Sequence, residues 1–582
     1  MTHETYPDDG CSAGHTHAMS GSTVSSDTLE HDHVEVPHTG DWLIAGRSRR
    51  VERGLLQILP GLSVAGLGAV LALCGVALAT SFYPLNHTDI WAHMALGRQM
   101  VETGHAVTSE PFRFHDAGEP FFNPGWLSQV ALYLWYDLAG AEGLVLAQML
   151  LAVAAAGLMI LALHARGVPP AWSIVLGVAS HFLALPIVGT MRPQSFAPLL
   201  CAALLFGLSR VERSRLPLFW VPAVMALWAN VHGSFLMGLV VLGLWTIGQL
   251  YEARRITGCW QQAFADPLVR RFGLLTALST AATFVNPDGP ALLWQAAFFS
   301  QRETLSRIIE WQPLSIKSLG GLLFYSSLLV TMILLRRSPR RFTAGEVLLL
   351  LFVGWSTLSA IRMLAWWALV WTWIIGPHLA ALVPLNRREE LALDPAPNAK
   401  RTWLAIAAVF VTILWSPPAR ALVVGLPRSE ATIVSAATPI YLADDLVESK
   451  SSGRFFSRMD WGDYLLWRTH GAMEPMVYSH VHNVPAVVWS DYEELAAGSP
   501  AWLKIVDHYR LKYLVICPVR QPALCSMALE SPRCRLVYRD EQGMVFEVLA
   551  ATKPGSKTAP QSADQTSIKS DTAQAPKPVP IN

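Results

Sequence analysis

The residue types best suited to chemistry gather in one polar segment behind the first long apolar stretch. Asp89 and His93 are four residues apart, so a helix would place them on one face, and Glu110 follows on the same loop. Two carboxylates and an imidazole can bind a divalent cation. The hard oxygen ligands favour Mg²⁺ or Mn²⁺, while zinc stays compatible. The alternative for Asp89 is a helix N-cap. We expect the three side chains to contribute to a metal site whose coordination shell they do not complete.

Two arginines and a histidine stand where other apolar stretches begin, end or break. Arg192 and Arg362 suit a phosphate at a membrane surface, because the guanidinium fork matches phosphate oxygens; simple anchoring is the equal alternative. His232 precedes Gly233 at a break between two apolar stretches, where it either serves a site or satisfies the backbone. Glu310 lies in a further polar segment, and we treat it as a fourth candidate.

The composition indicates that these side chains are positioned by a membrane-embedded scaffold. Of 582 residues, 52% are hydrophobic and 15% charged, against about 25% charged in a soluble domain, and the mean hydropathy is +0.34. The net charge of +1 argues against a nucleic-acid partner. Residues 1–54 are polar and contain six histidines, among them His15, His17, His31, His33 and His38. This composition predicts a disordered cytoplasmic tail, with a metal-binding histidine tract as the alternative. Because the tail is polar, we expect the first apolar stretch to act as an uncleaved membrane anchor.

Residues 55–424 predict a polytopic α-helical membrane domain of about eleven transmembrane helices. The expected spans are 55–82, 142–164, 171–190, 193–210, 217–231, 233–252, 271–287, 319–336, 344–360, 363–384 and 402–424.

The basic residues predict the orientation, because short cytoplasmic loops are rich in Lys and Arg. With the N-terminus in the cytoplasm, every basic loop falls on one side of the cytoplasmic (inner) membrane, and residues 425–582 lie outside. The basic groups are Arg47/Arg49/Arg50/Arg53, Arg210/Arg213/Arg215, Arg254/Arg255/Arg270/Arg271, Arg336/Arg337/Arg340/Arg341 and Arg387/Arg388/Lys400/Arg401.

The outer side then carries a long first loop and a C-terminal domain. Loop 83–141 predicts two interfacial helices, the first with an apolar stripe from Ile90 to Val101 and the second starting near Trp126. Residues 425–550 predict a small extracytoplasmic α/β domain with a strand at 513–517 and a β-hairpin at 535–548. Residues 551–582 predict a disordered tail.

Cys525 and Cys534 either form a disulfide in an oxidising compartment or stay free.

The chain resembles the GT-C superfamily of integral-membrane glycosyltransferases over roughly residues 55–550. Asp89 to Arg98 through Glu110 is similar to the acidic first-loop motif of bacterial family-39-type enzymes and oligosaccharyltransferase catalytic subunits. Ile308–Trp311 resembles the short oligosaccharyltransferase motif that ends in Glu. Asp460–Tyr464 resembles its Trp-Trp-Asp-Tyr-Gly motif, with the order altered. The second acidic pair that such an enzyme carries in an outer loop is missing near Arg192.

The resemblance implies transfer of a sugar from a polyprenyl-phosphate donor to an acceptor on the extracytoplasmic face. It assigns catalysis to Asp89 and Glu310. In the same scheme Arg192, Arg362 and His232 bind the lipid phosphate, the predicted metal ligands hold Mg²⁺ or Mn²⁺, and Trp461 and Asp463 contact the acceptor. The sugar and the acceptor stay open.

Two alternatives remain at this point. A transporter or flippase of lipid-linked or polar substrates would explain the broken apolar stretch at Asn230–Gly233. A structural membrane protein with a partner-binding outer domain is also compatible, but it would leave the clustered acids of the first loop unexplained.

Overall fold

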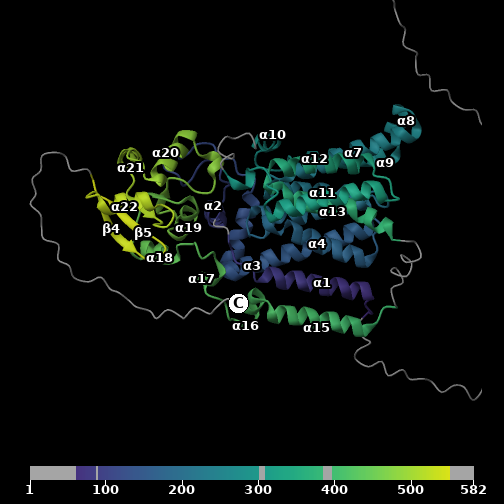
Figure 1. Ribbon diagram of the computed structural model, residues 1–582, viewed down its shortest axis with the longest axis horizontal. Helices are drawn as coiled ribbons and strands as arrows, with labels where there is room; N and C mark the ends of the chain where they lie inside the picture. Colours follow the sequence, from purple (N-terminus) through teal and green to yellow (C-terminus); the bar gives the residue numbers. More distant parts are fainter. Residues whose placement is uncertain (1–59, 87–88, 300–307, 384–395, 551–582) are drawn as a thin grey trace, which may run out of the picture.

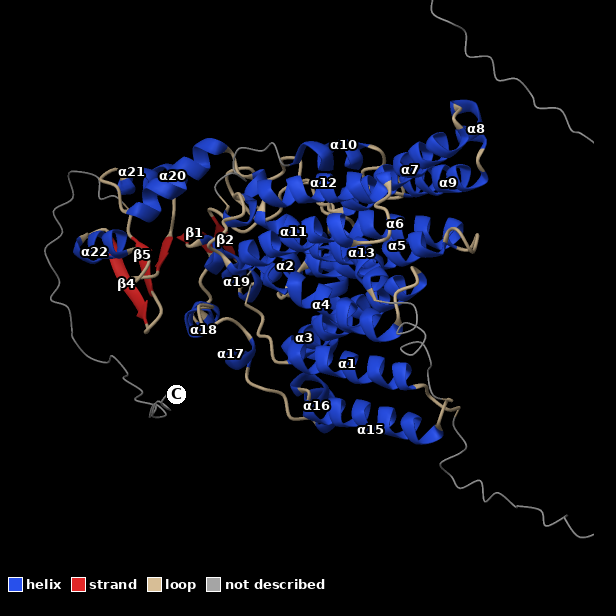
Figure 2. Cartoon of the chain, turned by 45° about the vertical axis from the view of Figure 1, so that its right-hand side comes forward, coloured by secondary structure: helices blue, strands red, loops and turns tan. Residues whose placement is uncertain are grey.

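A bundle of long helices and a mixed α/β domain lie at opposite ends of the molecule in the computed structural model (Figure 1). The structure describes residues 60–86, 89–299, 308–383 and 396–550; the predicted tails at 1–54 and 551–582 lie outside them. Within these ranges the strands occur only in the C-terminal domain (Figure 2).

Each predicted span overlaps at least one helix of the bundle. These helices are α1 (Val64–Ser81), α3 (Trp126–Ala165), α4 (Pro170–Val188), α5 (Ala197–Arg210), α6 (Pro217–Val231), α7 (Phe235–Thr257), α9 (Pro267–Ala282), α11 (Leu319–Arg337), α12 (Ala344–Ser359), α13 (Leu364–Leu382) and α15 (Ala399–Trp415). Shorter helices α8 (Trp260–Ala265), α10 (Ala291–Phe298) and α16 (Pro417–Val424) join them.

Among the described residues, five helices are long and apolar enough to cross a membrane, or up to six if α15 and α16 form one span. The chain is an integral membrane protein, but the number eleven is not established, since Pro170–Ala184, Pro217–Val231 and Ala344–Ser359 are shorter apolar helices.

Helix α13 is the centre of the bundle, because its residues are apolar on every side and almost all are buried. Its indole N–H groups would be costly to leave without acceptors in this environment. Trp367 donates to Ser327 Oγ at 2.7 Å, Trp371 to Thr331 Oγ1 at 2.8 Å and Trp373 to Ser209 Oγ at 2.8 Å. Hydroxyls on α11 and α5 therefore fix the rotation of α13.

The last predicted span is wrong as a continuous helix. The chain bends by 84° between α15 and α16, immediately before Pro417 and Pro418. A proline disfavours helical backbone at the residue before it and donates no backbone hydrogen bond, so the helix ends at Trp415. Helix α15 lies beside α1 in both ribbon views (Figures 1 and 2).

The first loop forms the helices that its pattern predicts. Helix α2 (Asp89–Thr103) carries the apolar stripe, and α3 begins at Trp126. The second interfacial helix begins at Trp126 and is divided from the following span at Gly140. The label α3 covers both parts, but Gly140 has non-helical angles (φ 60°, ψ −159°), a conformation that suits a residue without a Cβ.

The C-terminal domain is a five-stranded sheet with helices around it. Its strands are β1 (Gly453–Ser457), β2 (Met473–Pro475), β3 (Tyr513–Ile516), β4 (Cys534–Arg539) and β5 (Met544–Val548), in the order β2-β1-β3-β5-β4. Strand β1 runs parallel to β2 and β3, whereas β5 is antiparallel to β3 and β4. The helices are α17 (Glu430–Ile433), α18 (Ile440–Glu448), α19 (Met459–Arg468), α20 (Ala486–Ala497), α21 (Trp502–Tyr509) and α22 (Pro522–Glu530).

The predicted hairpin is confirmed as β4 and β5, while β1 and β2 were not predicted. Cys525 and Cys534 are both free, so the disulfide alternative is wrong. Cys525 is instead buried against Met544, with 3.7 Å between the sulfur atoms.

Helix α19 packs on α2, which joins the C-terminal domain to the first loop. Trp91 meets the ring of Tyr464 edge-on with 5.1 Å between centroids. The Arg98 guanidinium lies 4.4 Å from the Trp467 ring centroid and donates to the Trp467 carbonyl at 3.2 Å. The domain is thus held directly over the segment that begins with Asp89.

Candidate active site

Arg192 bridges two carboxylates from distant parts of the chain. Its Nη1 donates to Asp89 Oδ2 at 3.3 Å and its Nη2 to Glu310 Oε1 at 2.6 Å. Asp89 is the first residue of α2, and Glu310 lies in the short 3₁₀ helix η5 (Ile309–Trp311). Three predicted site residues therefore form one cluster.

A tight turn positions Arg192 just ahead of the 3₁₀ helix η2 (Pro193–Phe196). Its backbone N–H donates to Ser195 Oγ at 3.1 Å, its carbonyl accepts from the Ser195 N–H at 2.8 Å, and the Ser195 hydroxyl donates to the Thr190 carbonyl. The side chain is buried. Burial alone would lower the pKa of the Arg192 guanidinium, but Asp89 and Glu310 outweigh it and raise that pKa. Arg192 is a permanent cation here.

Arg362 is a second cation of the same cluster. It lies in the 3₁₀ helix η6 (Ile361–Met363), and its guanidinium stacks 4.4 Å from the ring centroid of Trp311. The Ile361 N–H donates to the Gln312 carbonyl at 3.0 Å, which ties η6 to η5. Its charge interacts with those of Glu310, Arg192 and Asp89.

His232 belongs to the cluster as a neutral group. Its Nδ1 accepts from the Ser234 backbone N–H at 3.1 Å, so Nε2 carries the proton. Burial lowers the pKa of His232 well below its ordinary value, and the positive charges of Arg362 and Arg192 lower it further. It can donate a hydrogen bond from Nε2 but supplies no positive charge.

His93 lies where the first loop meets the C-terminal domain. Gln129 Nε2 lies 3.1 Å from its Nδ1, and Gln129 in turn exchanges two hydrogen bonds of 2.8 Å with Asn123. The ring of His480 packs edge-on against His93 with centroids 4.7 Å apart. Sequence reasoning missed His480, because no local pattern distinguishes it and only the folded domain brings it to the site.

Glu110 is part of a different cluster. Its carboxylate lies 2.8 Å from Arg113 Nη2 and accepts hydrogen bonds from the Tyr478 hydroxyl at 3.1 and 3.2 Å. Burial raises the pKa of Glu110, with Arg113 as the main opposing influence. Within the described residues no three His, Cys, Asp or Glu side chains are arranged to hold a metal ion. The expected ligand set of Asp89, His93 and Glu110 is therefore not assembled.

Trp461 and Asp463, the expected acceptor contacts, are interior residues. The Trp461 indole donates to the Ala437 carbonyl at 2.8 Å. Asp463 accepts from the Ser479 backbone N–H at 2.9 Å and from its hydroxyl. Burial raises the pKa of Asp463 well above its usual range. Both side chains are buried, so an acceptor has no surface of either to contact.

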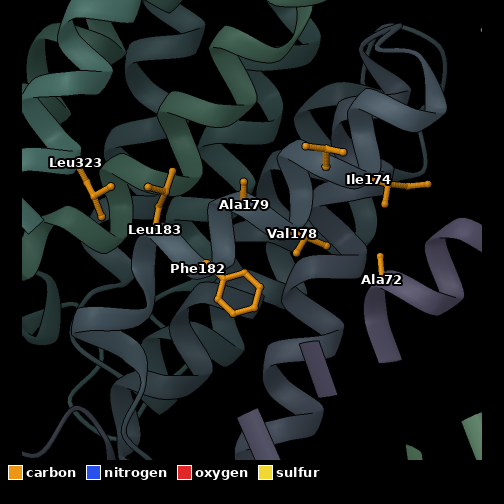
Figure 3. A pocket seen from close by; sticks show the side chains of 8 residues that line it. Ala72, Ile174, Val178, Ala179, Phe182, Leu183 and Leu323 are labelled. Atoms are coloured by element: carbon orange, nitrogen blue, oxygen red, sulfur yellow. The ribbon is translucent and has the colours of Figure 1, made fainter. Parts of the chain in front are cut away.

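A separate apolar cavity of about 630 Å³, largely open at the surface, is lined by α1, α4 and α11. Figure 3 shows that the side chains lining it are aliphatic apart from Phe182. No charged side chain lines it, so it suits a hydrocarbon and not a sugar.

Comparison with known proteins finds likeness only at the level of structure. No protein-family profile matches the chain, and no curated protein matches it. The oligosaccharyltransferase AglB of the archaeon Archaeoglobus fulgidus, solved with an inhibitory peptide and a dolichol-phosphate, aligns with a TM-score of 0.48 and 12% identity over 79% of this chain and 71% of its own. The mycobacterial arabinofuranosyltransferase AftD aligns with a TM-score of 0.49 and 16% identity over 84% of this chain and 40% of its own. Both neighbours are named as enzymes that transfer sugars.

Proposed function

We propose that the chain is a glycosyltransferase that moves a sugar from a polyprenyl-phosphate donor to an acceptor on the extracytoplasmic face of the membrane. One observation carries the proposal. Asp89, Arg192, Glu310 and Arg362 come from four separate segments and converge where the first loop meets the helical bundle. Buried ionisable groups at a membrane protein's surface are costly, which makes such a convergence a functional site by default.

The charges of this cluster suit the two ends of a glycosyl transfer. An acceptor hydroxyl or amide attacks the anomeric carbon, Asp89 takes its proton, and the bond between that carbon and the phosphate oxygen breaks. The lipid phosphate leaves with the bonding electrons and gains one negative charge. Arg192 and Arg362 stabilise that charge, and the His232 Nε2–H adds a neutral hydrogen bond.

Glu310 has a positioning role in this scheme. Its 2.6 Å contact with Nη2 holds the Arg192 guanidinium in one orientation, and Arg192 Nη1 in turn holds Asp89 Oδ2 at 3.3 Å. The apolar cavity beside α4 is our candidate for part of the polyprenyl tail, because α4 leads directly to the turn that holds Arg192. The predicted Mg²⁺ or Mn²⁺ is not carried into the mechanism, because both carboxylates already contact a guanidinium.

The test is consumption of polyprenyl-phosphate sugars by the purified protein. Asp89→Asn keeps the size and capping ability of the side chain but cannot accept a proton, so we expect turnover to fall by about 10²–10⁴-fold. Glu252→Gln is the matched control, since Glu252 pairs with Arg341 at the predicted cytoplasmic end of the bundle. Expression and thermal unfolding are compared first. Turnover of the Asp89→Asn protein equal to that of wild type would reject the role of Asp89 in catalysis.

A further inference from the structure

We infer that Arg192 occupies the place of a divalent cation in this site, so that its guanidinium supplies the bridging positive charge and the site holds no metal. The meaning of this inference for catalysis rests on the proposed function. Its structural content rests on the contacts of Arg192 and on the charges around it.

The first argument is geometric. Asp89 and Glu310 approach different nitrogens of one guanidinium, at 3.3 Å and 2.6 Å, so the planar group lies between the two carboxylates. A Mg²⁺ ion needs oxygen ligands at about 2.0–2.1 Å in near-octahedral geometry. Arg192 would have to leave before one ion could contact both carboxylates.

The Arg192 side chain is held in its position between the two carboxylates. Its side chain is 8% exposed, and its backbone is hydrogen-bonded on both sides of the turn through Ser195. Moving the guanidinium out would strip a buried cation of both counterions, which is strongly unfavourable. A metal would therefore compete against a pre-formed ion triad.

The second argument is the charge of the cluster. Among the described residues its ionised groups are Asp89, Glu310, Arg192 and Arg362, so two negative and two positive charges cancel. His232 is neutral. Adding a divalent ion would place two further positive charges beside two guanidinium groups. The positive charge that a phosphate requires is already present without it.

The third argument is a hydrogen-bond donor of Arg192 that has no acceptor among the described residues. Arg192 Nε is buried and has no hydrogen-bond partner among the described residues, although Nη1 and Nη2 both have one. An orphaned buried donor on a permanent cation indicates an anionic ligand that completes it. The geometry points to a phosphate oxygen of the donor, so one guanidinium would join both carboxylates and the leaving group.

Metal binding is measured directly on the full-length protein, stripped with EDTA and titrated with Mn²⁺ while free Mn²⁺ is followed by electron paramagnetic resonance. The N-terminal histidines can bind Mn²⁺, so only binding that Asp89→Asn abolishes is assigned to the site. We expect no such Asp89-dependent Mn²⁺ in wild type. Arg192→Ser removes the guanidinium and should gain one Mn²⁺ per chain, which the double variant with Asp89→Asn loses again.

Two results would overturn the inference: Asp89-dependent Mn²⁺ in the wild-type protein, or no gain of Mn²⁺ by a folded Arg192→Ser protein. Arg192→Lys keeps the charge but not the fork, so it should stay free of Asp89-dependent Mn²⁺ and lose at least about tenfold in sugar transfer. Wild-type transfer should change less than twofold with EDTA. Absence of transfer under every condition would reject the proposed function and leave the Mn²⁺ result unaffected.

Discussion

Arg113 is the group whose removal should most weaken the attachment of the C-terminal domain. Its guanidinium is fully buried and contacts Glu110 at 2.8 Å and Asp116 at 2.7 and 3.0 Å. It also donates to the carbonyls of His480 and Asn483, at 3.3 and 3.2 Å. One side chain thus neutralises two buried carboxylates of the first loop and binds the segment of the domain that carries His480.

Arg113→Met preserves the apolar bulk of the side chain and leaves both carboxylates without their cation. Removing one partner of a buried ion pair costs about 3–5 kcal/mol. We expect the lower half of that range, because Glu110 keeps the Tyr478 hydroxyl and Asp116 keeps the imidazole of His115 at 3.0 Å. Thermal unfolding is followed with a thiol-reactive dye, since Cys517 and Cys525 are free and buried within the domain.

The matched control is Arg533→Met, which breaks a largely exposed pair with Asp507 in the same domain. Exposed pairs contribute about 0–1 kcal/mol. The loss in Arg113→Met should also shrink as the pH falls. Without Arg113 the pKa of Glu110 in the folded protein rises further. A carboxyl group whose pKa is raised on folding destabilises the fold only as the pH climbs towards and through that raised pKa, so at low pH the variant loses less. Equal losses in the two variants, or a loss independent of pH, would refute the reasoning.

Two further predictions concern the domain and the membrane topology. Asp463→Asn should stabilise the domain at neutral pH and progressively less as the pH falls, because burial raises the pKa of Asp463 and its ionised form becomes costly only as the pH rises. Chemical unfolding of both proteins at several pH values checks this. A difference in unfolding free energy that does not change with pH would contradict it. Reporter fusions after Arg341 and after Gly453 should read cytoplasmic and extracytoplasmic respectively, and the same location for both would overturn the orientation.

Local patterns in the sequence predict the helices and the hairpin well, because these elements depend on residues that lie close together in the sequence. The apolar stripe from Ile90 to Val101 predicts α2, and alternating residues around Gly543 predict β4 and β5. Strands β1 and β2 have only five and three residues and no alternation that distinguishes them from loop. The bend before Pro417 was missed because apolar composition alone suggested one continuous span.

Single residues of the candidate site could be named from the sequence, whereas their contacts with one another could not. Asp89, Arg192 and Glu310 were all singled out, but their direct contacts join segments far apart in the sequence, which periodicity does not report. Glu110 was grouped with Asp89 because both lie on one loop. In the fold its charge is satisfied by Arg113, three residues away, and by Tyr478 of the C-terminal domain. A shared loop was therefore a poor guide to which acidic residues belong to one site.

The central claim is tested most directly by the mass of the lipid that the purified protein releases from a polyprenyl-phosphate sugar. Attack at the anomeric carbon leaves the phosphate on the lipid. The account therefore predicts polyprenyl phosphate from wild type and from Glu252→Gln, and about 10²–10⁴-fold less from Asp89→Asn. Release of free polyprenol would mean that the phosphate travels with the sugar. Intact donor across a panel of sugars and acceptors would favour a transporter; either result would contradict glycosyl transfer by this cluster.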